Sequence, residues 1–535
     1  MRDLIRDYHA SGSTLTSIGT IAANSKTLTL DFAIDFLDRH GIFIPNAGPM
    51  CTLSAPSAPS ISIGGGPSGK ETYGYQIVAL DGLGGGSAAS AIGTCTTGPA
   101  TLGGLGANGD GDGQLIYRAS WLAINVQDVA GANGRYAVYR VQVPSSSGLQ
   151  LGFIGIYSYT NTPFFDYGQA VKTPPPGVPA QPPAKPFAQS LVTTIGLGAS
   201  TAQITLTDAA STDAVNVTVY HDDTDAILRA FADTSSLHIP EGQFGLSQAA
   251  TFAMTNGRIT GEGRQSVIRM QGSWEASISL VGDGITLQDV AFDGQKVAHN
   301  LVNFSGNDIK IEGTFGTSPL FGGISANNAD VSKWLRNILL DRNEYTDCEY
   351  TYSLEGNLED LRITNNRASF TDYNYASRGI SLHNAGTQQG YTFPRRFTVS
   401  GNVLRCGNHS GAIVLQGCGK GTVSNNVMLS SGGVYGFWGI GCADYIDQCG
   451  EWTCTDNHIE SLWQQCGVGV NLDNLANVTV GGNTIDGFGY AYQIGGYGGG
   501  ALVDDPKNAV RMYGDNLINL QDGTYCGTVP QSVVA

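Results

Sequence analysis

A short pattern that recurs between about residues 285 and 486 constrains the fold of this chain more than any other feature. Each copy reads apolar, any residue, apolar, two polar or small residues, usually asparagine, any residue and apolar, as in 361–368 (LRITNNRA). Degenerate copies centre on Val290 and Thr314, and the clear copies carry their asparagine at six positions: Asn343, Asn366, Asn402, Asn426, Asn457 and Asn483. A repeat of about 20 to 50 residues indicates a solenoid, in which each repeat adds one coil.

Apolar residues alternate with period two inside each copy, so each copy is expected to be a strand with one face turned inward. Asparagine suits the bend after such a strand because it tolerates the left-handed conformation and can hydrogen-bond to the backbone or to an asparagine one coil away. The six asparagines are therefore expected to stack as a column inside a parallel β-helix.

The composition fits a turn-rich β protein. The 535 residues include 74 glycines, with 41% hydrophobic and 14% charged residues, which argues against disorder. A chain of this length allows several domains. The formal net charge of −17 disfavours nucleic acid and anionic membranes as partners, and says little about carbohydrate.

Targeting, membrane and metal signals are weak in this sequence. No apolar run reaches about 18 residues, so no membrane span is expected. Residues 1–10 lack the apolar core of a secretory signal, which predicts a cytoplasmic start and mostly reduced thiols among the ten cysteines. Cys406 and Cys454 fall on inward positions of the repeat, where cysteine acts as a small core residue. No metal or other cofactor is predicted, because no CxxC pair or His/Cys ligand set is present.

Composition shifts divide the chain into five predicted segments. Residues 1–52 form an N-terminal β element for attachment, and 53–186 form a β-sandwich-like, fibronectin-III-like domain that ends in a proline-rich linker. Residues 187–218 are a connecting β segment, 219–520 the β-helix and 521–535 a C-terminal tail. Within the fourth segment, 221–231 has acidic and threonine residues before apolar residues at helical spacing, which predicts a short amphipathic helix over the open end of the β-helix.

Two groups of motifs resemble known families. The helix motif at 222–227 (DDTDAI), with 238–244 (HIPEGQF) and 260–263 (TGEG), resembles the start of the pectate-lyase-like right-handed parallel β-helix superfamily. The sandwich segment, with 74–87 and 136–140 (YAVYR), resembles domains found on phage and prophage tail spikes. Such proteins are commonly homotrimers that bind and cut bacterial surface polysaccharide. The resemblance implies a virion-tail location, with a tail or baseplate partner at the N-terminal region.

The strands that precede the asparagine motifs carry a predicted row of outward residues. In this superfamily each coil has three strands, and here the first can be aligned on an inward Leu or Ile at 354, 382, 415, 440 and 472. The residue after each inward position then points outward. This alignment places one row along the outer face: Glu355, His383, Gln416, Gly441 and Asp473.

Glu355 and His383 are predicted to lie side by side, because neighbouring coils stack about 4.8 Å apart. A carboxylate beside an imidazole can act as a general acid/base pair, and contact between them would raise the His383 pKa and lower the Glu355 pKa. The alternative is an ordinary solvated pair on a sheet surface.

Loops around this pair favour a sugar-binding cleft. They carry acidic, aromatic and basic residues, namely Asp347, Glu349, Asp372, Tyr373, Tyr375 and Arg378. Sugar rings pack on aromatic faces, and two carboxyl groups flanking a glycosidic bond can hydrolyse it. Hydrolysis would use two of Glu349, Glu355 and Asp372. A lyase would instead use His383 as base and Arg378 to stabilise an enolate.

Further along the solenoid, Gln416, Trp438 and Asp473 are predicted to extend the substrate site, although Trp438 can equally point inward. The leading hypothesis is a tail-spike-like depolymerase that binds and cleaves a capsule, O-antigen or exopolysaccharide, with hydrolysis favoured over elimination. One alternative is an extracellular bacterial lyase or glycan transferase, fructan transferase included, on the same β-helix. Another is a carbohydrate-binding adhesin without catalytic activity.

Overall fold

The structure is a computed structural model of the 535-residue chain. It describes the whole chain except residues 66–67, 103–104, 110–114, 133–134, 159–162, 167, 199–201, 273–275, 329, 331, 371–377, 388–389, 393, 407–410, 431–437, 444–451, 462–467, 474–477, 495–509, 521–522 and 527–535. The chain forms two compact units. The first comprises Met1–Thr251, Thr260–Ser277 and Val290–His299, and the second comprises Phe252–Ile259, Ile278–Asp289 and Asn300–Ala535.

The first unit contains a six-stranded antiparallel sheet that joins two distant parts of the sequence. Its order is β14 (Leu191–Thr194), β4 (Gly41–Ile44), β16 (Ala214–Asp222), β2 (Ser17–Ile21), β3 (Thr27–Leu30) and β15 (Gln203–Thr205). Strands of 187–218 therefore pair with strands of 1–52, and buried side chains from both segments share one hydrophobic core. The predicted connecting β segment, 187–218, thus belongs to the same sheet as the N-terminal segment.

The segment between these two parts folds as a β-sandwich, which confirms the predicted strands there. One sheet has the order β12 (Gly152–Ser158), β11 (Arg135–Gln142), β6 (Glu71–Ala79) and β7 (Gly93–Gly98), and the other β13 (Phe164–Asp166), β10 (Trp121–Asn125) and β5 (Ser60–Gly65). Both are antiparallel, and a core rich in tyrosine and isoleucine fills the space between them. A hairpin of β8 (Leu105–Gly109) and β9 (Leu115–Ala119) extends from this domain.

The predicted amphipathic helix is present as α2 (Thr224–Asp233), and its apolar residues Ala226, Ile227, Ala230 and Phe231 are buried. A shorter helix, α1 (Leu4–Tyr8), was not predicted. The strands after α2 pair in parallel: β17 (Ser236–His238) pairs with the N-terminal strand β1 (Arg2–Asp3), and β18 (Gly242–Leu246) pairs with β20 (Arg258–Met270). None of the helices that the described residues form is long and apolar enough to span a membrane.

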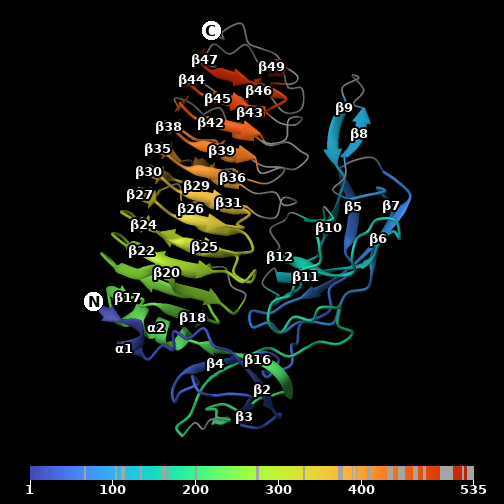
Figure 1. The fold of residues 1–535 in the computed structure, drawn as a ribbon, viewed down its shortest axis with the longest axis vertical. Coiled ribbons are helices and arrows are strands. Elements are labelled where there is room, and N and C mark those ends of the chain that lie inside the picture. The colour runs from blue at the N-terminus through green and yellow to red at the C-terminus, as the bar shows by residue number, and fades with distance from the viewer. Residues whose placement is uncertain are drawn as a thin grey trace. The chain divides into compact units, whose positions relative to one another are not determined.

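The second unit is a parallel β-solenoid, as the repeat predicted (Figure 1). In one sheet, the strand before each asparagine and the strand after it pair in parallel with the corresponding strands of the next coil. Its strands are β24 (Lys310–Glu312), β25 (Phe315–Thr317), β27 (Leu335–Asp341), β28 (Glu344–Thr346), β30 (Leu358–Thr364), β31 (Arg367–Ser369), β35 (Arg395–Ser400), β36 (Val403–Cys406), β38 (Gly421–Ser424), β39 (Val427–Ser430), β41 (Trp452–Thr455), β42 (His458–Ser461), β44 (Val478–Gly481), β45 (Thr484–Asp486), β47 (Val510–Tyr513) and β48 (Asn516–Ile518).

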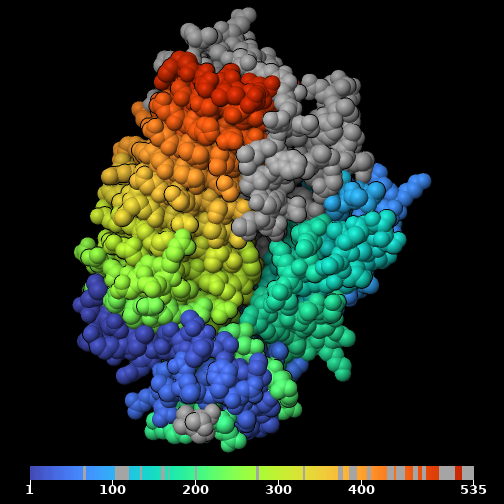
Figure 2. All heavy atoms as spheres, viewed as in Figure 1, coloured from blue at the N-terminus to red at the C-terminus, as the bar shows by residue number. Residues whose placement is uncertain are grey.

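A second parallel sheet contains the strands that precede the asparagine motifs. From residue 300 onward its order is β23 (Asn300–Ser305), β26 (Gly322–Asn328), β29 (Tyr350–Gly356), β32 (Arg378–His383), β37 (Gly411–Gln416), β40 (Trp438–Ala443), β43 (Val468–Asp473), β46 (Tyr490–Ile494) and β49 (Gly523–Cys526). In Figure 2 the coils of this unit follow one another as bands from yellow to red. Strand β49 lies within the predicted C-terminal tail, so strand pairing continues past residue 520.

The asparagine column is present as predicted. The side-chain Nδ2 of each asparagine from Asn343 to Asn457 donates to Oδ1 of the next at 2.9 to 3.1 Å. The backbone N–H of each donates to the same oxygen, and Asp515 accepts from Asn483 at the end of the row. All six asparagines are at most 2% exposed. Because every buried amide has a partner one coil away, the column stabilises the stacking of the coils.

The left-handed residues of these bends lie one position before the asparagines, which corrects the prediction. Arg342, Asn365, Asn425 and Asp456 have φ between 55° and 57°, and Gly401 has φ 68°. None of the six column asparagines, all of which the structure describes, has a positive φ. Their amides are committed to the column, so the preceding residue makes the turn. Cys406 and Cys454 are buried inward, as predicted.

Candidate functional site

The outer row predicted along the second sheet exists at its first three positions. Glu355 at the end of β29 is in register with His383 at the end of β32, and His383 is in register with Gln416 at the end of β37. The parallel pairing places these residues on adjacent coils. The prediction that Glu355 and His383 are neighbours is therefore confirmed.

The fourth position of the row was predicted wrongly. Ala443, not Gly441, is in register with Gln416, and Asp473 follows Ala443. Ile440 pairs with Ile413, one inward position earlier than the alignment assumed. A slip of two residues preserves the alternation of inward and outward positions, so the sequence pattern alone could not detect it.

Glu355 is half-buried and hydrogen-bonds away from His383. Its Oε2 accepts from Nδ2 of Asn327, at 2.9 Å, and Asn327 precedes Glu355 in the same row on strand β26. Burial raises the pKa of Glu355 above its ordinary value, because desolvation disfavours the charged form. The prediction that the imidazole lowers this pKa was wrong.

His383 is an uncharged imidazole at neutral pH. Burial, followed by the positive charge of Arg378, lowers the pKa of His383 to about 4, against a weaker opposing effect of a hydrogen bond to Gln416. Its Nε2 lies 3.4 Å from Nη1 of Arg378 and also contacts Oγ of Ser381. The predicted increase in this pKa was wrong, because the nearest charge is a cation and not the Glu355 carboxylate.

Arg378 is held by an aromatic stack. Its guanidinium carbon lies 4.9 Å from the ring centre of Tyr350, and Tyr350 stacks on Phe321 with ring centres 4.4 Å apart and an interplanar angle of 27°. The Arg378 backbone N–H donates to the Glu349 carbonyl at 2.6 Å. Cation–π contact over a partly buried ring restrains the guanidinium, so a fixed positive charge faces the His383 ring.

The remaining predicted residues fall into three groups. Asp347 and Glu349 lie on the chain leading into β29. Asp347 has a left-handed φ of 57°, and its N–H donates to the Ser369 carbonyl of the next coil at 3.0 Å. Asp372, Tyr373 and Tyr375 lie outside the described residues. Trp438 and Asp473 are placed by strand register only, opposite Gly411 and Ala443 respectively.

Several residues of this cluster were missed from the sequence, namely Asn327, Phe321, Tyr350 and Ser381. Asn327 could have been found by extending the outer row one coil back, although β26 lacks the Leu-x motif of the later strands. Phe321 and Tyr350 meet only through strand pairing between coils, which no local pattern indicates. Their contact can be found only from the tertiary structure.

The cluster brings the groups needed for acid/base chemistry together on the adjacent strands β29 and β32. Glu355 with a raised pKa can donate a proton, neutral His383 can accept one, and Arg378 can neutralise an anion. Among the described residues, no group of three or more His, Cys, Asp or Glu side chains is arranged to hold a metal ion. A site with displaced pKa values beside a fixed charge is a candidate functional site.

Comparisons with known proteins give only distant similarity. No family model matches the chain, and no curated protein matches it. Among solved structures, the mannuronan C-5 epimerase AlgE4 A-module of Azotobacter vinelandii shows 15% identity over 59% of this chain and 96% of its own, with a TM-score of 0.39. A GH87 α-1,3-glucanase catalytic domain shows 10% identity over 98% of this chain and 96% of its own, with a TM-score of 0.42. The tailspike protein of E. coli bacteriophage HK620 shows 10% identity over 58% and 60%, with a TM-score of 0.42. Similarity at this distance does not assign a function.

Proposed function

We propose that the chain binds a polysaccharide along the second sheet of its solenoid and cleaves it at the cluster of Glu355, His383 and Arg378. The observation that carries this proposal is the 3.4 Å approach of Arg378 to a neutral His383, in register with a Glu355 of raised pKa. The stack of Tyr350 on Phe321 lies beside them and holds the Arg378 guanidinium in place.

The described groups form a complete set for β-elimination from a uronic acid. His383 would remove the proton next to the sugar carboxylate, and Arg378 would stabilise the negative charge that develops on that carboxylate. Glu355 would protonate the departing glycosidic oxygen as the carbon–oxygen bond breaks. The product would carry an unsaturated sugar at its new non-reducing end. This chemistry requires an acidic polysaccharide.

Hydrolysis is the second candidate. It needs two carboxyl groups about 5 to 9.5 Å apart, one as acid and one as nucleophile or base. Glu355 fits the acid because burial raises its pKa. The second carboxylate would be Glu349, which precedes β29, or Asp372.

Digestion of a panel of acidic and neutral bacterial polysaccharides tests these proposals. Chain length, new reducing ends and ultraviolet absorbance would be followed together. Reducing ends with absorbance would support elimination, and reducing ends without it would support hydrolysis. Binding without shortening would leave an adhesin, and neither binding nor shortening would refute the polysaccharide function.

We further propose a tail-spike role, on the basis of the motif resemblance. The target would be a capsule, O-antigen or exopolysaccharide, the assembly a homotrimer and the location the virion tail, with attachment through residues 1–52. Native mass spectrometry of the full chain tests the trimer, and a monomeric mass would contradict it. An extracellular bacterial lyase or glycan transferase would act through the same cluster without binding to phage tails.

A further inference from the structure

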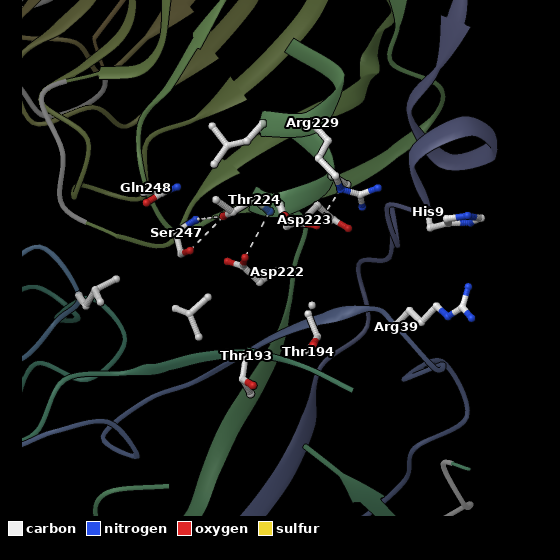
Figure 3. A pocket seen from close by; sticks show the side chains of 16 residues that line it. His9, Arg39, Thr193, Thr194, Asp222, Asp223, Thr224, Arg229, Ser247 and Gln248 are labelled. Atoms are coloured by element: carbon white, nitrogen blue, oxygen red, sulfur yellow. Dashed lines mark hydrogen bonds and ion pairs between the residues drawn. The ribbon is translucent and has the colours of Figure 1, made fainter. Parts of the chain in front are cut away.

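A second candidate site lies in the first unit, away from the Glu355 cluster in sequence. A cavity of about 500 Å³ is lined by the end of β16, the first turns of α2, strand β14 and the turn after β18 (Figure 3). Its volume falls within the range of small-molecule sites, which are mostly preformed and combine apolar walls with a few polar groups.

Asp222 is the buried polar group of this cavity. Its side chain is 4% exposed, and Oδ1 accepts from the Thr224 backbone N–H at 3.2 Å. Its Oδ2 is buried and has no hydrogen-bond partner among the described residues. Figure 3 shows the carboxyl group in the cavity between Thr224 and Ser247 on one side and Thr193 on the other. A buried carboxyl oxygen without a partner is costly, so it marks a place for a ligand.

The adjacent acid is different. Asp223 Oδ2 accepts from the Gly245 N–H at 3.1 Å, and Oδ1 accepts from the Ser11 N–H. These bonds tie three segments of the first unit together, which explains Asp223 as a structural residue. Asp222 is held less firmly: the Thr224 N–H lies 3.2 Å from its Oδ1, and the nearby Thr224 and Ser247 hydroxyls, which favour its charged form, bond to each other at 3.0 Å.

The rest of the lining narrows the class of ligand. Exposed His9, Arg39 and Arg229 belong to the lining, where Arg229 also donates to Asp225 and to the Tyr8 carbonyl. Half-buried Leu83, Val192 and Leu228 give the cavity apolar walls. The arginines disfavour a cation, and the aspartates disfavour a simple anion. A neutral polyhydroxylated ligand can use both donors and acceptor.

We propose that this cavity binds a neutral sugar unit, with Oδ2 of Asp222 accepting a hydroxyl hydrogen and the apolar walls contacting the sugar ring. Burial raises the pKa of Asp222 to about 6, so the carboxyl group is mostly ionised and acts as an acceptor at neutral pH. The site is distinct from the Glu355 cluster and does not depend on its activity. It would give the first unit a carbohydrate contact of its own.

Saturation-transfer NMR of the full chain with methyl glycosides of glucose, galactose and N-acetylglucosamine tests this site. At least one glycoside is expected to bind. Asp222→Asn should weaken its binding by roughly 10- to 100-fold, because a hydrogen bond to a charged group is lost. Leu228→Trp should abolish binding by filling the cavity from a half-buried position, and it covers the case in which Asp222→Asn does not fold.

The control is Glu355→Gln, which is expected to leave this binding unchanged and so separates the cavity from the proposed catalytic cluster. The proposal is overturned if none of the three glycosides binds, or if binding survives both cavity variants. It is also overturned if Glu355→Gln alone removes the signal, or if calcium or inorganic phosphate displaces the glycoside from this cavity.

Discussion

Two sets of polar side chains on the solenoid differ in how they are partnered. In the asparagine column, each amide donates to the next coil and to a backbone carbonyl, as Asn402 does to Asn426 and to Ile363. On the outer row, Glu355 has one hydrogen bond from Asn327, and His383 lies against a cation. Fully partnered polar groups specify structure, whereas groups with displaced pKa values mark candidate chemistry. The following experiments test this comparison.

Breaking the column should have the largest effect on stability. Asn402→Ala removes the acceptor of the Asn366 backbone and side-chain N–H groups and the donor to Asn426 and Ile363. We expect a loss of roughly 4 to 5 kcal/mol in the free energy of unfolding, because several buried groups lose partners. Urea denaturation monitored by circular dichroism measures it.

The matched control is Asn516→Ala, an exposed asparagine on β48 outside the column, which should change stability by less than about 0.5 kcal/mol. Similar losses in the two variants would mean that the column is not a special source of stability.

Changing the outer row should affect activity and spare the fold. Glu355→Gln removes the proposed proton donor, so cleavage should fall by about 10²- to 10³-fold. Stability should be unchanged or slightly higher, because a half-buried acid is replaced by a neutral amide. Product formation under saturating polysaccharide measures the effect.

Glu460→Gln serves as the control for this change, since Glu460 pairs with His458 on the other ladder. Its activity should equal that of the unchanged chain. Full activity in Glu355→Gln would remove this residue from the site.

The pH dependence separates the two outer residues. His383 stays neutral until its pKa of about 4, so activity should be lost only as the pH falls through that value. On the alkaline side, activity should fall as the pH rises through the raised Glu355 pKa. An acidic limb near pH 6.5 would show that the imidazole is not buried as described.

Stability carries a related signature. Because the folded pKa of His383 lies below its ordinary value of 6.5, the unfolded chain binds a proton first. Folding stability is therefore highest above pH 6.5, where His383 is neutral in both states, and it decreases as the pH falls from 6.5 toward 4. Comparing urea midpoints at pH 7 and pH 5 in the parent and in His383→Gln isolates it.

An exposed ion pair should show the smallest effect. Asp360 accepts two hydrogen bonds from Arg396, each at 2.8 Å, and the Arg396 and Asp360 side chains are 53% and 37% exposed. Asp360→Asn should cost less than about 1 kcal/mol of stability, because solvent screens such pairs. A loss as large as that of Asn402→Ala would break the distinction between buried and exposed partners.

The repeat determined the solenoid, the six-membered asparagine column, the inward cysteines and the pairing of Glu355 with His383, because these follow from the strand period and a fixed coil spacing. The amphipathic pattern likewise determined α2. Only the tertiary structure decided that 187–218 completes the N-terminal sheet, that Ala443 occupies the fourth outer position and that Arg378, stacked on Tyr350, faces His383. It also decided the pKa directions of Glu355 and His383. Desolvation and the nearest charge depend on segments that are far apart in the chain, and no local pattern encodes them.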